Sequence, residues 1–221
     1  MQGYVPKYVR VFLLDDHDLV RKGLRDLLAP ATDIHVVGDS GSADYARRAI
    51  LALETDIMVL DLHLQDGTGV SVCREVRSVD PSIRGLLLTA SGDDEALTAA
   101  ILAGAAGYLV KLARNSDIIG AIRRLAMGKS LIDPATAAQL TGRMLADIDE
   151  LRPPLTDYER EILTLVVRGH TIRPIAERMT VPLEPLAADV MALVERVIRP
   201  LSPEGLEPPS VPPGRHRRSD G

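Results

Sequence analysis

The chain has 221 residues, of which 46% are hydrophobic and 26% are charged, and its formal net charge at pH 7 is −5. This composition is typical of a globular protein with one good core and a second, smaller one. The negative charge and the absence of tryptophan argue against a chain built throughout for nucleic-acid binding. No apolar run approaches the roughly 18 residues that span a bilayer, and Met1–Lys7 do not resemble a signal peptide. With a single cysteine, and so no internal disulfide, the chain is expected in the cytoplasm and not in a membrane.

Short apolar runs alternate with helical patterns over residues 1–127. The apolar runs predict strands at 9–14, 35–37, 57–60, 85–88 and 107–110. The helical spacing predicts helices near 19–28, 43–53, 70–76, 94–103 and 115–127, with Ser42 as the cap of the second. Five such repeats with wholly apolar strands predict an α/β fold, a doubly wound parallel sheet covered by helices on both faces.

The remainder of the chain is different in composition. Residues 128–154 form a linker, in which the Ala-rich stretch 134–145 is a candidate helix. Residues 155–198 are a short helical unit, and Pro153 and Pro154 punctuate the chain in front of it. From residue 199 proline recurs with serine and glycine and the chain ends in basic residues, which predicts a disordered tail over 199–221.

Polar side chains stand where the predicted strands end. Asp15 and Asp16 follow the first strand, Asp61 the third, Thr89 the fourth and Lys111 the fifth. Any one of them alone is an ordinary turn residue. Ligands of open parallel sheets bind at the carboxyl ends of the strands, so the convergence of five such residues on one edge predicts a functional site there.

The residue types suggest the chemistry of that edge. Clustered carboxylates repel each other and need a cation, and Mg²⁺ suits oxygen ligands. A carboxylate can also attack phosphorus to give an aspartyl phosphate. The metal would neutralise charge on the transferring phosphoryl group, while an ammonium and a hydroxyl hold its oxygens.

The sequence around these positions resembles the receiver domain of bacterial two-component response regulators, and its details resemble the NarL/FixJ subfamily. The matching blocks are residues 14–17, 59–62, 88–90 and 107–111, with 66–69 and 104–107 giving the subfamily details. The resemblance covers about residues 8–127 and implies a CheY-like receiver domain within 1–127. It further implies a phosphoprotein controlled by a sensor histidine kinase, and not a dedicated enzyme.

The resemblance also assigns roles to single residues. Asp61 would be the phospho-acceptor, and Asp15, Asp16, Asp61 and the backbone carbonyl of His63 would bind Mg²⁺. Thr89 and Lys111 would read the phosphoryl group, and Tyr108 would be the aromatic that swings inward on activation. One departure is Gln65, which stands where the family usually has proline and suggests a less rigid loop.

Other uses of the same residues are less favoured. A dehalogenase-type phosphatase needs a second carboxylate two residues after its nucleophile, and His63 stands there. A dinucleotide-binding fold needs a glycine-rich turn after the first strand, which Asp15-Asp16-His17-Asp18 does not provide. His17 and His63 lack partners at zinc spacing and are interpreted as loop histidines, and Cys73 as a core residue.

Residues 155–198 resemble a LuxR-type helix-turn-helix domain. Residues 155–163 match its opening, Gly169 its turn, 171–179 the scaffold helix and 183–197 the position of the recognition helix. The second half departs from the family, because Ala187 replaces the lysine that would meet DNA and Asp189 replaces a histidine or tyrosine.

Residues 155–198 also contain two prolines at the start of the predicted recognition helix and carry a negative net charge. Pro182 and Pro185 fall near the cap and in the first turn of the predicted helix, where proline is tolerated. The five basic and seven acidic side chains of 155–198 give a net charge of −2, which is unfavourable for DNA binding.

Two functions therefore stay open. The first is a phosphorylation-controlled transcription factor, in which Arg173, Arg178 and the basic tail contact DNA. The second is a phosphorylation-dependent protein-interaction or dimerisation module that has lost DNA binding. A homodimer on activation is expected in either case.

Overall fold

The computed structural model describes residues 8–89, 94–111, 117–147 and 154–198. The tail predicted to be disordered, 199–221, lies outside this part of the chain. Within the described residues no helix is both long and apolar enough to cross a membrane.

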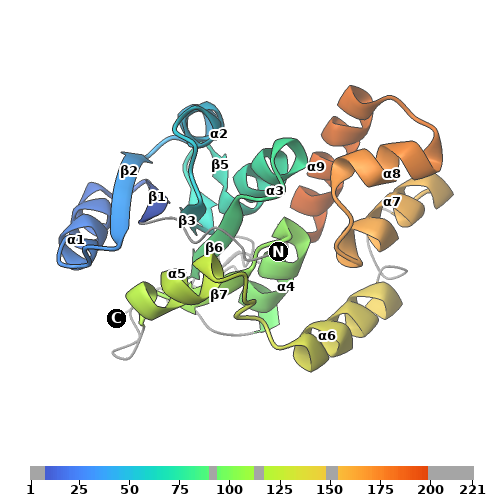
Figure 1. Cartoon of the computed structure of the whole chain (residues 1–221). Coiled ribbons are helices and arrows are strands. Elements are labelled where there is room, and N and C mark those ends of the chain that lie inside the picture. Colours follow the sequence, from blue (N-terminus) through green and yellow to red (C-terminus); the bar gives the residue numbers. More distant parts are fainter. Residues whose placement is uncertain (1–7, 90–93, 112–116, 148–153, 199–221) are drawn as a thin grey trace, which may run out of the picture.

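Five parallel strands form one sheet in the order β2-β1-β3-β6-β7 (Figure 1). The order reverses between β1 and β3, as in doubly wound folds of the flavodoxin and CheY type, and confirms the predicted fold class. The strands are β1 (Val9–Leu14), β2 (Ile34–Ser40), β3 (Ile57–Asp61), β6 (Arg84–Thr89) and β7 (Gly107–Val110).

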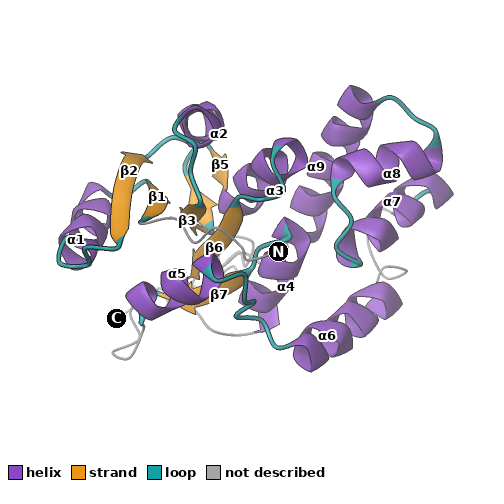
Figure 2. Ribbon diagram, in the orientation of Figure 1, coloured by secondary structure: helices purple, strands orange, loops and turns teal. Residues whose placement is uncertain are grey.

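Helices cover both faces of this sheet, as Figure 2 shows in purple. Val11 and Leu13 of β1 point to the face covered by two helices, α1 (Asp18–Leu28) and α5 (Ile118–Ala126). Phe12 and Leu14 point to the opposite face, which is covered by α2 (Ala43–Ala52), α3 (Gly69–Val79) and α4 (Asp94–Ala103). Alternate residues of a strand face opposite sides, so a strand buried on both faces is apolar throughout.

The ends of the helices follow local capping chemistry. The Ser42 hydroxyl accepts a hydrogen bond from Tyr45 N at 3.3 Å, which confirms the predicted cap of α2. The helix predicted over 115–127 begins later in the structure, and residues 115 and 116 lie outside the described part of the chain. Asp117 caps α5 by accepting from Gly120 N at 2.7 Å, so the helix begins at Ile118. Gly128 then adopts a left-handed φ of 83°, which ends the helix.

A small antiparallel hairpin, β4 (His63–Leu64) and β5 (Gly67–Thr68), follows β3. It was not predicted, because two strands of two residues are too short to show a periodic pattern. The hairpin matters for function because its first residues follow Asp61.

The C-terminal half is helical. Its helices are α6 (Pro134–Asp147), α7 (Asp157–Val167), α8 (Ile172–Met179) and α9 (Leu183–Ile198). Thr156 and Glu159 form a capping box at the start of α7, and Gly169 has the left-handed φ of 84° expected of the turn. Pro182 and Pro185 lie at the start of α9 without breaking it, as predicted.

The helical unit, residues 155–198, packs directly on the sheet unit, residues 8–126. α9 contacts α3, while α6 and α7 contact α4, and Figure 1 shows the same neighbours. The contacts close one continuous apolar cluster that runs from Val70 and Cys73 to Ile162 and Val190. The sequence did not predict this docking, because the apolar face of each helix is also explained by a separate small core.

Candidate functional site

The five polar residues predicted to converge do lie at one edge of the sheet. Asp15 and Asp16 follow β1, Asp61 ends β3, Thr89 ends β6 and Lys111 directly follows β7. Asp15, Asp61 and Thr89 are buried. The edge includes the β1–β3 boundary where the strand order reverses, which is where ligands bind in open α/β sheets.

Lys111 joins two of the carboxylates. Its Nζ lies 2.7 Å from Asp15 Oδ2 and 2.6 Å from Asp61 Oδ2. Its backbone is fixed as well, because Lys111 N donates to Thr89 O at 2.8 Å across β6 and β7. The ammonium therefore offsets the charge of two buried acids and sits within reach of any group bound to Asp61.

Burial and charge shift the acid–base behaviour of this pair. Burial raises the pKa of Asp61 above its usual value, and the Asp15 charge adds to the rise. The ammonium of Lys111 and the backbone N–H of His63 act in the opposite direction. Burial alone would lower the pKa of Lys111, but Asp15 and Asp61 outweigh it and raise that pKa. The lysine is thus held in its cationic form.

The potential metal-ligand atoms at this edge suit a hard divalent cation. Oxygen or nitrogen ligand atoms of Asp15, Asp16, His17 and Asp61 all lie within 4.8 Å of one another. Asp16 Oδ1 is buried and accepts no hydrogen bond from the described residues, although His17 Nδ1 lies 2.7 Å away. A buried carboxylate oxygen without a donor is costly, and carboxylates of this kind are the ligands that Mg²⁺ takes.

Two residues at this edge were not found from the sequence. Arg21 of α1 donates to the backbone oxygen of Asp15 at 2.5 Å, which fixes the β1–α1 turn. Gly69 approaches the Asp61 backbone so closely that a Cβ there would lie 2.1 Å from the Asp61 carbonyl oxygen. Arg21 has no sequence signal, because an arginine on an amphipathic helix is ordinary. Gly69 belongs to the 66–69 block that resembles the subfamily, but the sequence assigned no role at the site to it.

Asp66 tethers the hairpin that contains Gln65. Its carboxylate accepts from Ala43 N at 3.0 Å and from Ser42 Oγ at 2.8 Å, at the start of α2. The hydrogen bond from the Ala43 N–H holds the pKa of Asp66 below its usual value; burial opposes this shift, and the Ser42 hydroxyl adds to it. The loop is therefore anchored by a charged cap at the position next to the missing proline.

Tyr108 lies on β7, partly buried, beside a pocket of about 280 Å³ formed with α5. Leu109, Arg124 and Leu131 also line that pocket. Because Tyr108 pairs with Leu87 of β6, two residues before Thr89, it is in the neighbouring strand to the threonine.

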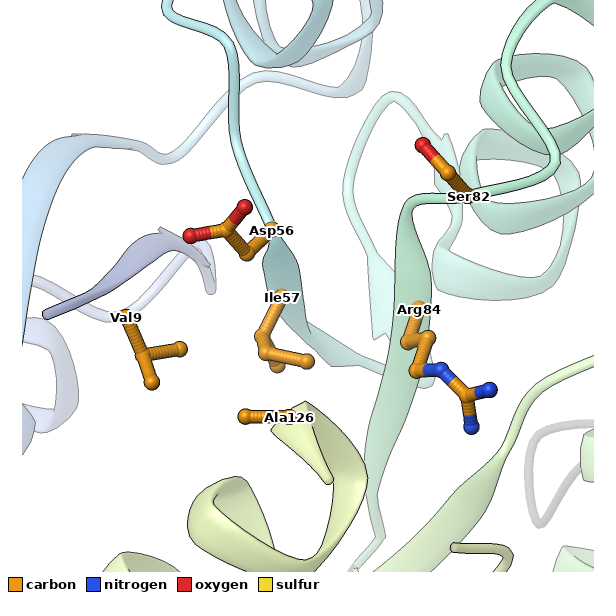
Figure 3. Close-up of a pocket in the computed structure, with 6 residues that line it drawn as sticks. All are labelled: Val9, Asp56, Ile57, Ser82, Arg84 and Ala126. Atoms are coloured by element: carbon orange, nitrogen blue, oxygen red, sulfur yellow. The ribbon is translucent and has the colours of Figure 1, made fainter. Parts of the chain in front are cut away.

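A second pocket, of about 170 Å³, lies at the opposite edge of the sheet (Figure 3). Val9, Ile57 and Arg84 there are the first residues of β1, β3 and β6, and Asp56 accepts from Arg10 N at 2.7 Å. The amino ends of the strands face this pocket, so it is separate from the carboxylate site.

The candidate DNA-contacting side chains are exposed. Arg173 and Arg178 both lie on α8 with exposed side chains. On α9, Ala187 is partly buried, and Asp189 Oδ2 accepts from Tyr158 Oη at 3.0 Å. The two residues that depart from the family pattern, Ala187 and Asp189, therefore make contacts inside the helical unit.

Known proteins with similar sequences agree with this geometry. Residues 11–123 match the family described as response regulator receiver domain. The chain is 42% identical over 173 residues to the DNA-binding transcriptional activator DevR/DosR of Mycobacterium tuberculosis, covering 77% of this chain and 80% of that protein. It is 29% identical to the response regulator protein VraR of Staphylococcus aureus, covering 86% of this chain and 90% of that protein.

A solved structure extends the likeness. The LuxR-family two-component response regulator of Aurantimonas sp. SI85-9A1 superposes with a TM-score of 0.55 at 29% identity, covering 62% of this chain and 99% of that one. Three findings agree: the strand order of the parallel sheet, the contacts of Lys111 with Asp15 and Asp61 at its edge, and the match of residues 11–123 to the receiver-domain family. The chain belongs to the response regulators of two-component systems, in the NarL/FixJ family with a LuxR-type C-terminal region.

Proposed function

We propose that Asp61 accepts a phosphoryl group from the phosphohistidine of a sensor histidine kinase in the cytoplasm. The observation that carries the proposal is the bridge of Lys111 Nζ between Asp61 at 2.6 Å and Asp15 at 2.7 Å. A buried carboxylate beside a fixed ammonium is placed both to attack phosphorus and to have its product stabilised.

The transfer balances without a further reactant. An Asp61 carboxylate oxygen forms a bond to phosphorus while the phosphorus–nitrogen bond of the phosphohistidine breaks, and the electron pair stays on the leaving imidazole. Lys111 holds one phosphoryl oxygen, and the buried Thr89 hydroxyl at the end of β6 holds another. Mg²⁺, held by Asp15, Asp16, Asp61 and the backbone carbonyl of His63, would supply charge neutralisation.

The signal then passes along β6 and β7. Movement of Thr89 toward the phosphoryl group opens space near the partly buried Tyr108, which turns inward and changes the face formed with α5. In this mechanism a local change of charge at Asp61 shifts Tyr108 between two packing arrangements. Asp61 takes one phosphoryl group per event and loses it by hydrolysis, so the chain is a regulated acceptor and not a dedicated enzyme.

The output we propose is transcription regulation by a homodimer on DNA. A receiver domain at 1–127, a linker at 128–154, a helix-turn-helix domain at 155–198 and the tail would divide the chain for this purpose. Exposed Arg173 and Arg178 on α8 would contact phosphates. The similarity to an activator that binds DNA supports this output.

A second output is favoured by the exposed residues of α9. Among the described side chains of α9, the exposed ones are Leu183, Glu184, Pro185, Ala188 and Ala192, and none of these is basic; Arg196 is only partly exposed and pairs with Glu159. DNA binding depends on neutralising phosphates, so such a face suits a protein partner or a second copy of the chain better. The alternative function is a phosphorylation-dependent interaction module without DNA binding.

Phosphotransfer is tested by incubating the protein with acetyl phosphate and Mg²⁺ and measuring the phosphorylated fraction by intact-mass spectrometry. Asp61→Asn is expected to remove the added mass. Asp26→Asn, an exposed acid on α1, is the matched control and is expected to keep it. Equal phosphorylation of Asp61→Asn and the unchanged protein would overturn the proposal.

The output is tested by duplex-DNA binding with and without beryllofluoride, which stands in for the phosphoryl group on Asp61, across a salt series. Binding that tightens on activation and weakens steeply with salt identifies a transcription factor. A change of oligomeric state without DNA binding at low salt identifies the interaction module.

A further inference from the structure

A small pocket lies at the interface between the sheet unit and the helical unit. Its volume is about 40 Å³, and its polar lining comes from Arg74 and Arg77 of α3 and from His170 and Thr171, which precede α8. The left-handed Gly104, at the end of α4, closes one side. No carboxylate is among the described residues that line it.

Arg74 is the unusual residue of this pocket. It is only 4% exposed, although arginine is rarely buried without a charged partner. Its guanidinium donates to the carbonyl oxygens of Leu102 in the sheet unit and, at 3.0 Å, of His170 in the helical unit. Its Nε is buried and donates to nothing in the described part of the chain.

The charge of Arg74 is not balanced by an acid. Among the described residues it forms no ion pair, and the nearby Arg77 adds a second cation. Burial lowers the pKa of Arg74 to about 10; Cys73 opposes this shift, and Arg77 adds to it. The guanidinium is still charged at neutral pH, and a buried charge without a counter-charge is strongly unfavourable. The C-terminal carbonyl of α4 offsets only part of it.

The start of α8 adds positive potential to the same place. Thr171 is the N-cap residue, but its side chain caps no N–H group of the first turn. Pro174, the third residue of α8, has no N–H, so the N–H groups of Ile172 and Arg173 supply the partial positive charge that can attract an anion there. Two guanidinium groups and a helix N-terminus therefore meet at one pocket.

We propose that this pocket binds a small tetrahedral oxyanion, inorganic phosphate or the phosphoryl group of a small metabolite, between Arg74, Arg77 and the start of α8. A water needs roughly 10–15 Å³, so the volume admits a single phosphoryl group and not a nucleobase. Because the ligand would contact both units, it would stabilise their docked arrangement.

The inference does not depend on phosphotransfer at Asp61, and the experiment separates the two sites. The full-length protein is titrated with inorganic phosphate and, separately, with glycerol phosphate, at constant ionic strength set by chloride. EDTA is present, so that no divalent cation supports phosphate binding near Asp61. Isothermal titration calorimetry gives the affinity, and thermal unfolding gives the midpoint shift.

Saturable binding with a higher unfolding midpoint is expected, unchanged in Asp61→Asn. Arg77→Gln, in a half-buried side chain, and Arg74→Gln are each expected to weaken binding about tenfold, the loss of one charge-assisted contact. Arg48→Gln, an exposed arginine on α2, is the control and should bind as the unchanged protein does. Preference for glycerol phosphate identifies a metabolite as ligand, and preference for phosphate identifies the free ion.

Two results would overturn the proposal. One is a midpoint that rises no more with phosphate than with chloride. The other is equal affinity in the unchanged protein, Arg77→Gln and Arg74→Gln, which would mean that an adventitious ion only is bound elsewhere.

Discussion

Tyr158 and Asp189 are joined by a hydrogen bond, Oη to Oδ2 at 3.0 Å, that ties α7 to α9. Burial, and then the nearby Asp189 carboxylate, raise the pKa of the Tyr158 hydroxyl. Asp189, which stands where the LuxR-type resemblance expects histidine or tyrosine, thus has a role inside the helical unit, where it helps to fix α9 relative to α7.

Restoring the family residues on α9 should restore phosphate contacts. We expect the Ala187→Lys, Asp189→His double variant to bind duplex DNA about tenfold more tightly at low salt, with a steeper salt dependence, because one cation is gained and one anion lost. Fluorescence anisotropy across a salt series measures both. Ala192→Lys combined with Glu184→Gln, at exposed positions of the same helix, gives the same net-charge change of +2 and is the control for charge alone. If the two variants bind equally, position 187 does not face DNA.

Removing the Asp66 carboxylate should destabilise the protein in a pH-dependent way. Asp66→Ala is expected to lower the free energy of unfolding by about 1 kcal/mol at pH 7, as for loss of a helix cap. The folded-state pKa of Asp66 is lowered, so its contribution is full above the unfolded value near 3.8 and is lost as pH falls through the folded value. Urea unfolding at pH 7 and at pH 3 measures it. A difference from the unchanged protein that grows on acidification would contradict the assignment.

A methyl group at Gly69 should disturb the site by displacing the backbone of Asp61. Gly69→Ala would place Cβ 2.1 Å from the Asp61 carbonyl oxygen, so the β3 end must shift, at a cost of about 1–3 kcal/mol. Slower phosphorylation by acetyl phosphate is expected as well. Gly23→Ala is the matched control, since nothing lies within 4 Å of a Cβ there and α1 should gain about 0.5–1 kcal/mol. Equal phosphorylation rates in both variants would show that Gly69 does not position Asp61.

Cys73 should resist thiol reagents in the folded protein. The side chain is fully buried, and burial raises the pKa of its thiol to about 12. Because the thiolate is the reactive form, labelling with a maleimide is expected only after unfolding in urea. Labelling as fast in buffer as in urea would mean that the α3 face of the cluster opens freely.

Most of the sheet unit could be predicted because its three central strands, β1, β3 and β6, are mostly apolar and buried. Runs such as 57–60 and 107–110 leave little choice of structure, and parallel strands bring their carboxyl ends to one edge. That is why Asp15, Asp61 and Lys111 could be grouped before any coordinates. The convergence of acids with a lysine carried more information than any residue alone.

The rest depended on contacts between segments far apart in the chain. Asp66 is an ordinary loop residue in the sequence, and only the fold brings its carboxylate to Ser42 and Ala43, 24 and 23 positions earlier in the chain. The burial of Arg74 was not predicted either. An arginine on a helix is normally exposed, and its partner His170 lies 96 positions later in the chain.

The apolar cluster shared by the two units would set a threshold for signalling if phosphorylation separates them. Since α3, α4, α7 and α9 bury side chains in one continuous core, heating should melt both units together in a single cooperative transition. Separating the units requires exposing that core to water, which opposes any activated state in which they part. The stability of this interface would then determine how much of the protein must be phosphorylated before a response begins. Substitutions at the interface would change the sensitivity to the stimulus and leave the chemistry at Asp61 unchanged.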